Sequence, residues 1–100
     1  MEKSQISQPK QDIDIIRKKL DEIDEKIVEL IIERFSHIPE ISAYKQEHNL
    51  PIQNKERERE VLETKAALVK NKEIPKEMIE QLFEIIMLYS RKEQEKLQEH

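Results

Sequence analysis

The feature that most restricts this chain is the complete absence of glycine from its 100 residues. Glycine supplies the backbone freedom that phosphate-binding loops, tight β-hairpin turns and many helix C-termini require. A chain without glycine is therefore a poor candidate for a nucleotide-binding loop or for a sheet of tight hairpins. The sequence predicts an all-α protein.

Length and composition set further limits. One hundred residues form a single small domain, and the lack of cysteine removes disulfides, thiolate metal sites and thiol nucleophiles. A net charge of −4 and an aromatic content of 4% disfavour a nucleic-acid-binding surface. The opening residues are polar and no run reaches membrane-spanning length, so we expect a cytoplasmic protein without a membrane or nucleic-acid partner.

The apolar residues recur at helical spacing along most of the chain. Residues 1–11 lack this period and are predicted to be a disordered tail, whereas residues 12–98 are predicted to form a helical domain. Its first helix is expected to run to about His48, roughly 50 Å at about 1.5 Å per residue. This helix is much longer than its neighbours, so we expect a homodimer to cover its apolar stripe.

Two more helices are expected after the first. Asn54 is a good N-cap residue for the second helix, and Asn71 with its neighbouring lysines suits its end. Pro75 stands where the third helix is expected to begin. The pattern predicts three helical segments per chain.

Basic side chains interrupt the apolar stripe of the first predicted helix. On a helical wheel Arg34 and Lys45 lie within about 20° of each other and face the core. Long basic side chains often extend from such stripes to water, so the position of each cation, taken alone, requires no functional role. Arg17 lies roughly 25 Å from Arg34 along the helix, and an antiparallel partner chain could bring the two arginines together.

The other two predicted helices also turn polar on their inner faces. Glu58, with Arg57 beside it, lies at the edge of the second apolar stripe, and Ser90 and Gln94 continue the third. Inward-facing cations need carboxylates or a bound anion, because burying an unpaired charge costs several kcal/mol. A pocket for an acidic small molecule explains these positions together.

Several runs of sequence carry a family resemblance, and they extend over about residues 12–98. The runs are Ile16-Arg17-Lys18-Lys19-Leu20-Asp21-Glu22-Ile23-Asp24-Glu25-Lys26-Ile27, Glu33-Arg34, Tyr44-Lys45, Leu50-Pro51-Ile52, Lys55-Glu56-Arg57-Glu58-Arg59-Glu60-Val61-Leu62, and Leu82-Phe83-Glu84-Ile85-Ile86 with Ser90 and Gln94. This pattern closely resembles the all-helical class of chorismate mutases. It implies a three-helix protomer with one long N-terminal helix and an intertwined six-helix homodimer. It also implies the rearrangement of dianionic chorismate to prephenate, in aromatic amino-acid biosynthesis, without a cofactor or metal ion.

The resemblance also implies a role for each matching residue. Arg34, with Arg17 of the partner subunit, would bind the substrate carboxylates, and Lys45 would hydrogen-bond the ether oxygen. The remaining matches are Gln94 at the ether oxygen, Glu58 at the ring hydroxyl, Arg57 and Ser90 at the ring and carboxylate, and Asn54 where the family usually has aspartate.

Pro39 departs from the expected pattern. In the interior of a helix running to His48 it would lose the hydrogen bond to the Phe35 carbonyl and cost about 3 kcal/mol or kink the helix. We expect a tolerated bend there. The histidines do not form a metal-ligating pattern and are expected on the surface.

Two alternatives to the mutase are open from sequence. One is isochorismate-pyruvate lyase, which shares the implied fold and acts on a sister substrate; Glu58, as a partner for the ring hydroxyl, favours the mutase. The other is a catalytically silent helical dimer that acts as a regulatory module. Association with another aromatic-pathway enzyme is also compatible with the sequence.

Overall fold

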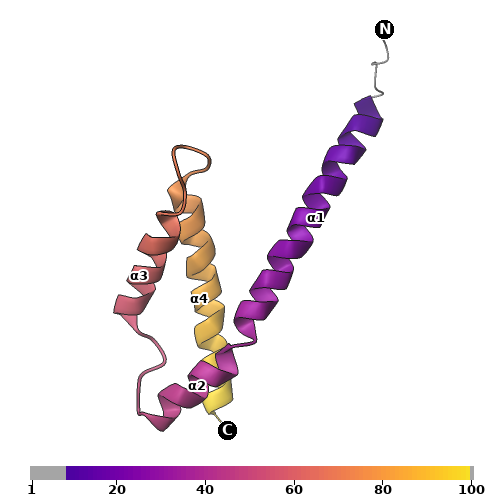
Figure 1. The fold of residues 1–100 in the computed structure, drawn as a ribbon. Helices are drawn as coiled ribbons and strands as arrows, with labels where there is room; N and C mark the ends of the chain where they lie inside the picture. The colour runs from indigo at the N-terminus through magenta and orange to yellow at the C-terminus, as the bar shows by residue number, and fades with distance from the viewer. Residues whose placement is uncertain (1–8, 100) are drawn as a thin grey trace. The chain divides into compact units, whose positions relative to one another are not determined.

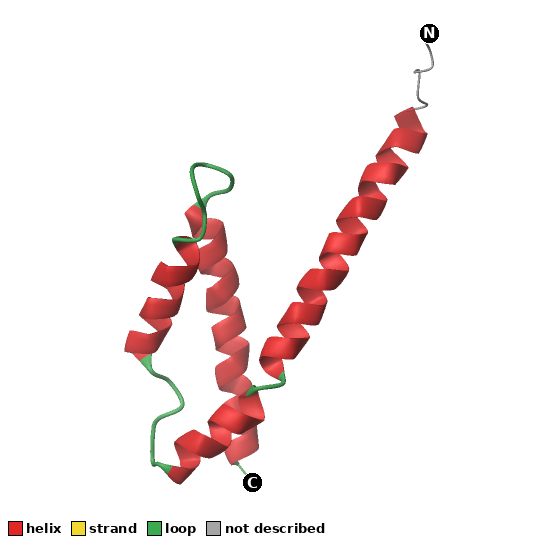
Figure 2. Cartoon of the chain, viewed as in Figure 1, coloured by secondary structure: helices red, strands yellow, loops and turns green. Residues whose placement is uncertain are grey.

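The computed structural model describes residues 9–99, and every regular element in that range is a helix (Figures 1 and 2). The helices are α1 (Pro9–Phe35), α2 (Ile38–Glu47), α3 (Lys55–Ala66) and α4 (Lys76–Gln98). The predicted all-α class is confirmed. Of the predicted tail, residues 1–8 lie outside the described residues, and residues 9–11 belong to α1.

The chain divides into two compact units between Phe35 and Ser36. The first unit contains α1, and the second contains α2, α3 and α4. In the second unit α4 packs against both α2 and α3. No helix within residues 9–99 is long and apolar enough to cross a membrane.

The expected uninterrupted first helix is wrong, because Ser36 and His37 separate α1 from α2. Pro39 is the second residue of α2 and lies in its first turn. In a continuous helix Pro39 could not donate to the Phe35 carbonyl and its ring would clash there. The chain instead ends one helix at Phe35 and begins another, at whose start a missing N–H costs nothing.

The backbone turns after α2 and in the connection between α3 and α4 without glycine. After α2, Asn49 takes a positive φ of 57° and the Leu50 N–H donates to the Lys45 carbonyl at 2.7 Å. Asn71 takes a similar φ of 55° in the connection to α4. Asparagine tolerates this left-handed region better than other residues with a Cβ atom.

The starts of α3 and α4 agree with the sequence analysis. The Asn54 side chain accepts a hydrogen bond from the Arg57 backbone N–H at 3.0 Å, which confirms the predicted N-cap. Pro75 occupies the residue before α4. The helix α3 ends at Ala66, however, which is earlier than the Asn71 expected, and residues 67–75 connect it to α4.

The core of the second unit is small. Five apolar residues are buried among those whose exposure is described, namely Ile38, Val61, Ala66, Val69 and Met87. Three polar residues are buried with them, namely Ser42, Ser90 and Gln94. Polar side chains therefore belong to the inside of this unit, where each must find a hydrogen-bond partner.

Replacing Pro39 with alanine tests its place in the first turn of α2. The fixed φ of proline suits a first turn and limits the unfolded chain, so we expect Pro39→Ala to reduce stability by about 0.4–1 kcal/mol. For a domain of this size the fall in Tm is about 2–8 °C. Differential scanning calorimetry measures the change, with the exposed Gln46→Ala in the same helix as control. A higher Tm for Pro39→Ala would show that the proline interrupts a continuous helix.

Candidate functional site

A hydrogen bond joins two predicted site residues that are far apart in sequence. Lys45 on α2 donates from Nζ to Oε1 of Gln94 on α4 at 3.0 Å. The same ammonium group donates to the carbonyl oxygen of Ile52 at 2.6 Å. Since Oε1 of Gln94 accepts from Lys45, its Nε2 group is left to donate to a bound molecule.

Glu58 forms the second part of this arrangement. Its Oε2 atom lies 2.5 Å from Nη1 of Arg91 on α4, and its Oε1 atom accepts from Nε2 of Gln53 at 3.2 Å. The Arg91 and Glu58 side chains are 25% and 21% exposed. We call Lys45, Gln53, Glu58, Arg91 and Gln94 the polar cluster. Helices α2, α3 and α4 all contribute to it, together with the loop before α3.

Electrostatics link the two parts of the polar cluster. Desolvation lowers the pKa of Lys45 below its ordinary value of 10.5, and the negative charge of Glu58 acts in the opposite direction. Burial disfavours the ammonium form, whereas a nearby carboxylate favours it. The polar cluster therefore holds a partly dehydrated cation beside a carboxylate that stabilises its charge.

The buried face of α4 fixes the positions of the remaining groups. Ser90 and Gln94 lie one turn apart on α4 and are 6% and 4% exposed. Near the end of α4, Gln98 donates from Nε2 to the carbonyl oxygen of Ser42 at 3.2 Å. This contact also joins α4 to α2. Two hydrogen bonds between these helices, Lys45 to Gln94 and Gln98 to Ser42, therefore align the amide of Gln94 with the ammonium of Lys45.

Two of the predicted site residues have other partners. The guanidinium of Arg57 pairs with Glu60 at 2.5 Å, and the two side chains are 59% and 60% exposed. The amide oxygen of Asn54 is used in the N-cap of α3. Both residues line an open cavity of about 440 Å³, together with Glu56, Arg59, Glu60 and Glu63. The structure thus places the side chains of Arg57 and Asn54 on an exposed face of α3 and not in the polar cluster.

Arg17 and Arg34 both lie on α1, in the first compact unit. Seventeen residues of helix separate them by roughly 25 Å at about 1.5 Å per residue, which is too far for one small ligand to bridge within one chain. Arg34 is in the last turn of α1, where a cation complements the helix dipole.

Arg91 and Gln53 are members of the polar cluster that the sequence analysis missed. The signal for Arg91 was present, because it lies four residues after the buried Met87 and three before Gln94. At about 100° per residue, Arg91 is within about 60° of both on the helix surface. The same wheel test that selected Lys45 would have selected Arg91. Gln53 lies in a loop and carries no comparable signal.

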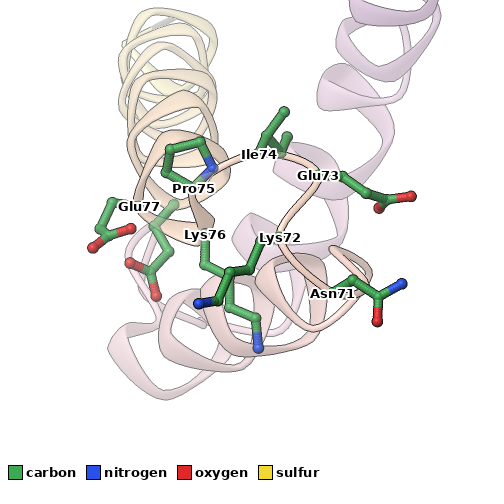
Figure 3. A pocket seen from close by; sticks show the side chains of 8 residues that line it. Asn71, Lys72, Glu73, Ile74, Pro75, Lys76 and Glu77 are labelled. Atoms are coloured by element: carbon green, nitrogen blue, oxygen red, sulfur yellow. The ribbon is translucent and has the colours of Figure 1, made fainter.

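A larger cavity, of about 640 Å³, lies at the connection between α3 and α4 (Figure 3). Its lining comes from the loop and the first turns of α4, namely Asn71, Lys72, Glu73, Ile74, Pro75, Lys76, Glu77 and Glu80. None of the predicted site residues lines it. Size alone does not make it the functional site, because its charged groups are side chains of a surface loop and helix start.

Metal ligation has no support among residues 9–99, where no group of three or more His, Cys, Asp or Glu side chains is placed to hold an ion. His37 lies 3.2 Å from Glu40, and His48 stacks on the Tyr44 ring at 4.1 Å.

The polar cluster can donate hydrogen bonds to one oxygen atom and accept one from a hydroxyl group. None of its members needs to change protonation to do so.

Comparison with known proteins identifies the same segment of chain. The sequence profile of the family described as chorismate mutase type II matches residues 16–95. A chorismate mutase of Methanocaldococcus jannaschii is 33% identical over 76 residues, which is 76% of this chain and 77% of that protein. A bifunctional chorismate mutase/prephenate dehydratase of Buchnera aphidicola is 37% identical over 83 residues, which is 83% of this chain and 22% of that protein.

Titration of Lys45 tests the electrostatics of the polar cluster. We expect nuclear magnetic resonance of its side chain to give a pKa below 10.5, and Glu58→Gln to lower the pKa of Lys45 further because the supporting charge is lost. Between the folded and unfolded pKa values the unfolded chain binds more protons, so this lysine makes stability rise as the pH rises through that interval. The exposed Glu63→Gln is the control. An unchanged pKa of Lys45 in Glu58→Gln would contradict the through-space effect of the Glu58 charge on Lys45.

Proposed function

The chain belongs to the chorismate mutase type II family, and from this premise we propose that the polar cluster is where it rearranges chorismate to prephenate. The enzyme is an isomerase. The observation that carries the assignment of the site is the convergence of Lys45, Gln94 and Glu58 from three helices. These residues match the family pattern at its two ether-oxygen positions and at its ring-hydroxyl position.

The reaction suits a site of fixed polar groups. A [3,3] rearrangement is unimolecular, breaks the ether C–O bond while a C–C bond forms, and requires no nucleophile. Catalysis comes from holding the substrate in a reactive conformation and from stabilising charge as it develops on the ether oxygen. The ammonium of Lys45 and the amide nitrogen of Gln94 are the donors for that oxygen. Partial burial strengthens both interactions relative to water.

The remaining matched residues complete the proposed site. Glu58 accepts the ring hydroxyl, and Ser90 contacts a substrate carboxylate from the buried face of α4. Arg57 reaches the substrate after leaving Glu60, and the exposure of that ion pair makes the exchange inexpensive. Asn54 acts through its cap of α3, which aspartate would serve equally well.

An intertwined homodimer supplies the rest of the site in this proposal. A single helix cannot bury its own stripe, and large apolar residues are exposed along α1, from 42% for Ile13 to 64% for Leu30. A second copy would cover this stripe and bring Arg17 of the partner subunit toward Arg34. The two arginines then bind the two carboxylates of the dianionic substrate.

This chain spans about a fifth of the length of the bifunctional relative, whose name also includes a dehydratase activity. A second enzyme domain beside a mutase domain supports the expectation that this chain associates with another pathway enzyme. That association, like the cytoplasmic location, stays a prediction.

Turnover of chorismate by the purified protein tests the function. We expect loss of absorbance from chorismate with formation of prephenate. In Lys45→Met and Gln94→Ala we expect kcat to fall by a factor of about 100 or more, with smaller changes in KM, because each variant lacks a donor to the transition state. Lys96→Met, on the exposed side of α4, is the control for loss of charge. No acceleration by the wild-type chain would contradict the mutase assignment. Salicylate and pyruvate from isochorismate would support the lyase.

Subunit exchange tests the shared site. Arg17→Ala and Arg34→Ala are each expected to be nearly inactive. In a randomly exchanged mixture, one site of each heterodimer carries both defects and the other carries neither, so we expect about a quarter of wild-type activity to return. Native mass spectrometry establishes that exchange has occurred. Exchange without any recovery would contradict the contribution of Arg17 from a partner subunit.

A further inference from the structure

We propose that Arg91 is a positioning residue, which holds the Glu58 carboxylate toward the substrate and away from Lys45. This inference deepens the proposed mutase function and rests on it. Arg91 does not contact the reacting atoms in this proposal. It acts through Glu58, the residue assigned to the ring hydroxyl.

The carboxylate of Glu58 is held at both oxygen atoms. Arg91 Nη1 lies 2.5 Å from Oε2, and Gln53 Nε2 donates to Oε1 at 3.2 Å. Arg91 and Glu58 are 33 residues apart in sequence and belong to different helices, α4 and α3. Two donors from different parts of the fold therefore fix the direction of one carboxylate.

The Arg91 and Glu58 pair differs from the surface pairs of the same chain. Its side chains are 25% and 21% exposed, compared with 59% and 60% for Arg57 and Glu60. Exposed ion pairs contribute little, whereas partly buried pairs are less screened by water and salt. Removing Arg91 would leave the Glu58 charge partly buried with one amide donor.

Lys45 is the alternative partner for that charge. The Glu58 carboxylate already acts on the Lys45 ammonium through space, yet the hydrogen bonds of the ammonium go to Gln94 and Ile52. If Arg91 were absent, attraction would draw the Glu58 and Lys45 side chains together. Both would then be displaced, Glu58 from the ring hydroxyl and Lys45 from the ether oxygen. Arg91 thus separates the anionic and cationic functions of the site.

The position of Arg91 on α4 supports this assignment. It lies next to the buried Ser90 and three residues before the buried Gln94. The backbone of α4 therefore connects Arg91, which orients Glu58, to Gln94, which accepts the hydrogen bond from Lys45. One rigid helix sets the spacing between the two halves of the polar cluster.

A double-mutant cycle tests whether Arg91 acts through Glu58. We expect Arg91→Met to lower kcat/KM about tenfold, mostly through kcat, and Arg91→Lys to retain part of the activity because a cation remains. In the Glu58→Gln background, Arg91→Met should change kcat/KM less than about twofold, since no carboxylate is left to orient. Arg59→Met is the matched control, because it removes an exposed arginine next to Glu58 on α3.

Each result decides the inference. An equal loss from Arg91→Met with and without the Glu58 carboxylate would overturn it, because Arg91 would then act independently of Glu58. A lower Tm with unchanged kcat and KM in Arg91→Met would also overturn it, since the pair would be merely structural. If Arg91→Met does not fold, the doubly neutral Glu58→Gln, Arg91→Met protein and Arg91→Lys carry the comparison. A wild-type chain without turnover would overturn the mutase function itself, which distinguishes that failure from failure of the Arg91 inference.

Discussion

The hydrogen bond between Lys45 and Gln94 is the interaction on which the organisation of the second unit depends. Few apolar side chains are buried among the residues whose exposure is described, so apolar packing alone fixes the helices weakly. Gln94 is 4% exposed, and its amide would be costly to bury without a partner. The bond satisfies the Oε1 acceptor of this amide and joins α2 to α4, while the Arg91 and Glu58 pair joins α3 to α4. The groups that stabilise the unit are thus also the groups proposed to act on the substrate.

This overlap between stability and function restricts the sequence in a specific way. No group of the proposed site forms or breaks a covalent bond during the reaction, so every contribution comes from where a charge or donor is placed. Partial burial strengthens the interaction of a lysine with developing charge. A loosely held lysine would lose this benefit, because reorienting its side chain during the reaction costs free energy. Lys45 has two protein acceptors, which hold its ammonium in one direction, and the Glu58 carboxylate opposes the fall in pKa that desolvation causes.

Local signals in the sequence predicted local structure well. Asn54 and Pro75 marked the starts of α3 and α4 because capping and fixed φ depend on a few neighbouring residues. The wheel also placed Lys45 and Gln94 on the inner faces of their helices and Glu58 at the edge of another. It failed where an outcome depends on competition between partners. Pro39 was placed in a helix interior, although the chain could restart a helix there. The family resemblance gave Arg57 a substrate contact, whereas in the structure its guanidinium pairs with Glu60. The partner of Arg91 is Glu58 on another helix, and the pattern of a single helix does not contain that pairing.

The two asparagines with left-handed backbone also bear on the unfolded chain. Asn49 and Asn71 turn the backbone at positions where glycine is the usual choice. Glycine loses more conformational freedom on folding than any other residue, so a chain that turns with asparagine begins from a narrower unfolded ensemble. The loss of conformational entropy on folding is therefore smaller at Asn49 and Asn71 than it would be with glycine at these positions. This helical unit has a small core, and part of its stability therefore comes from the restricted conformational freedom of its unfolded chain.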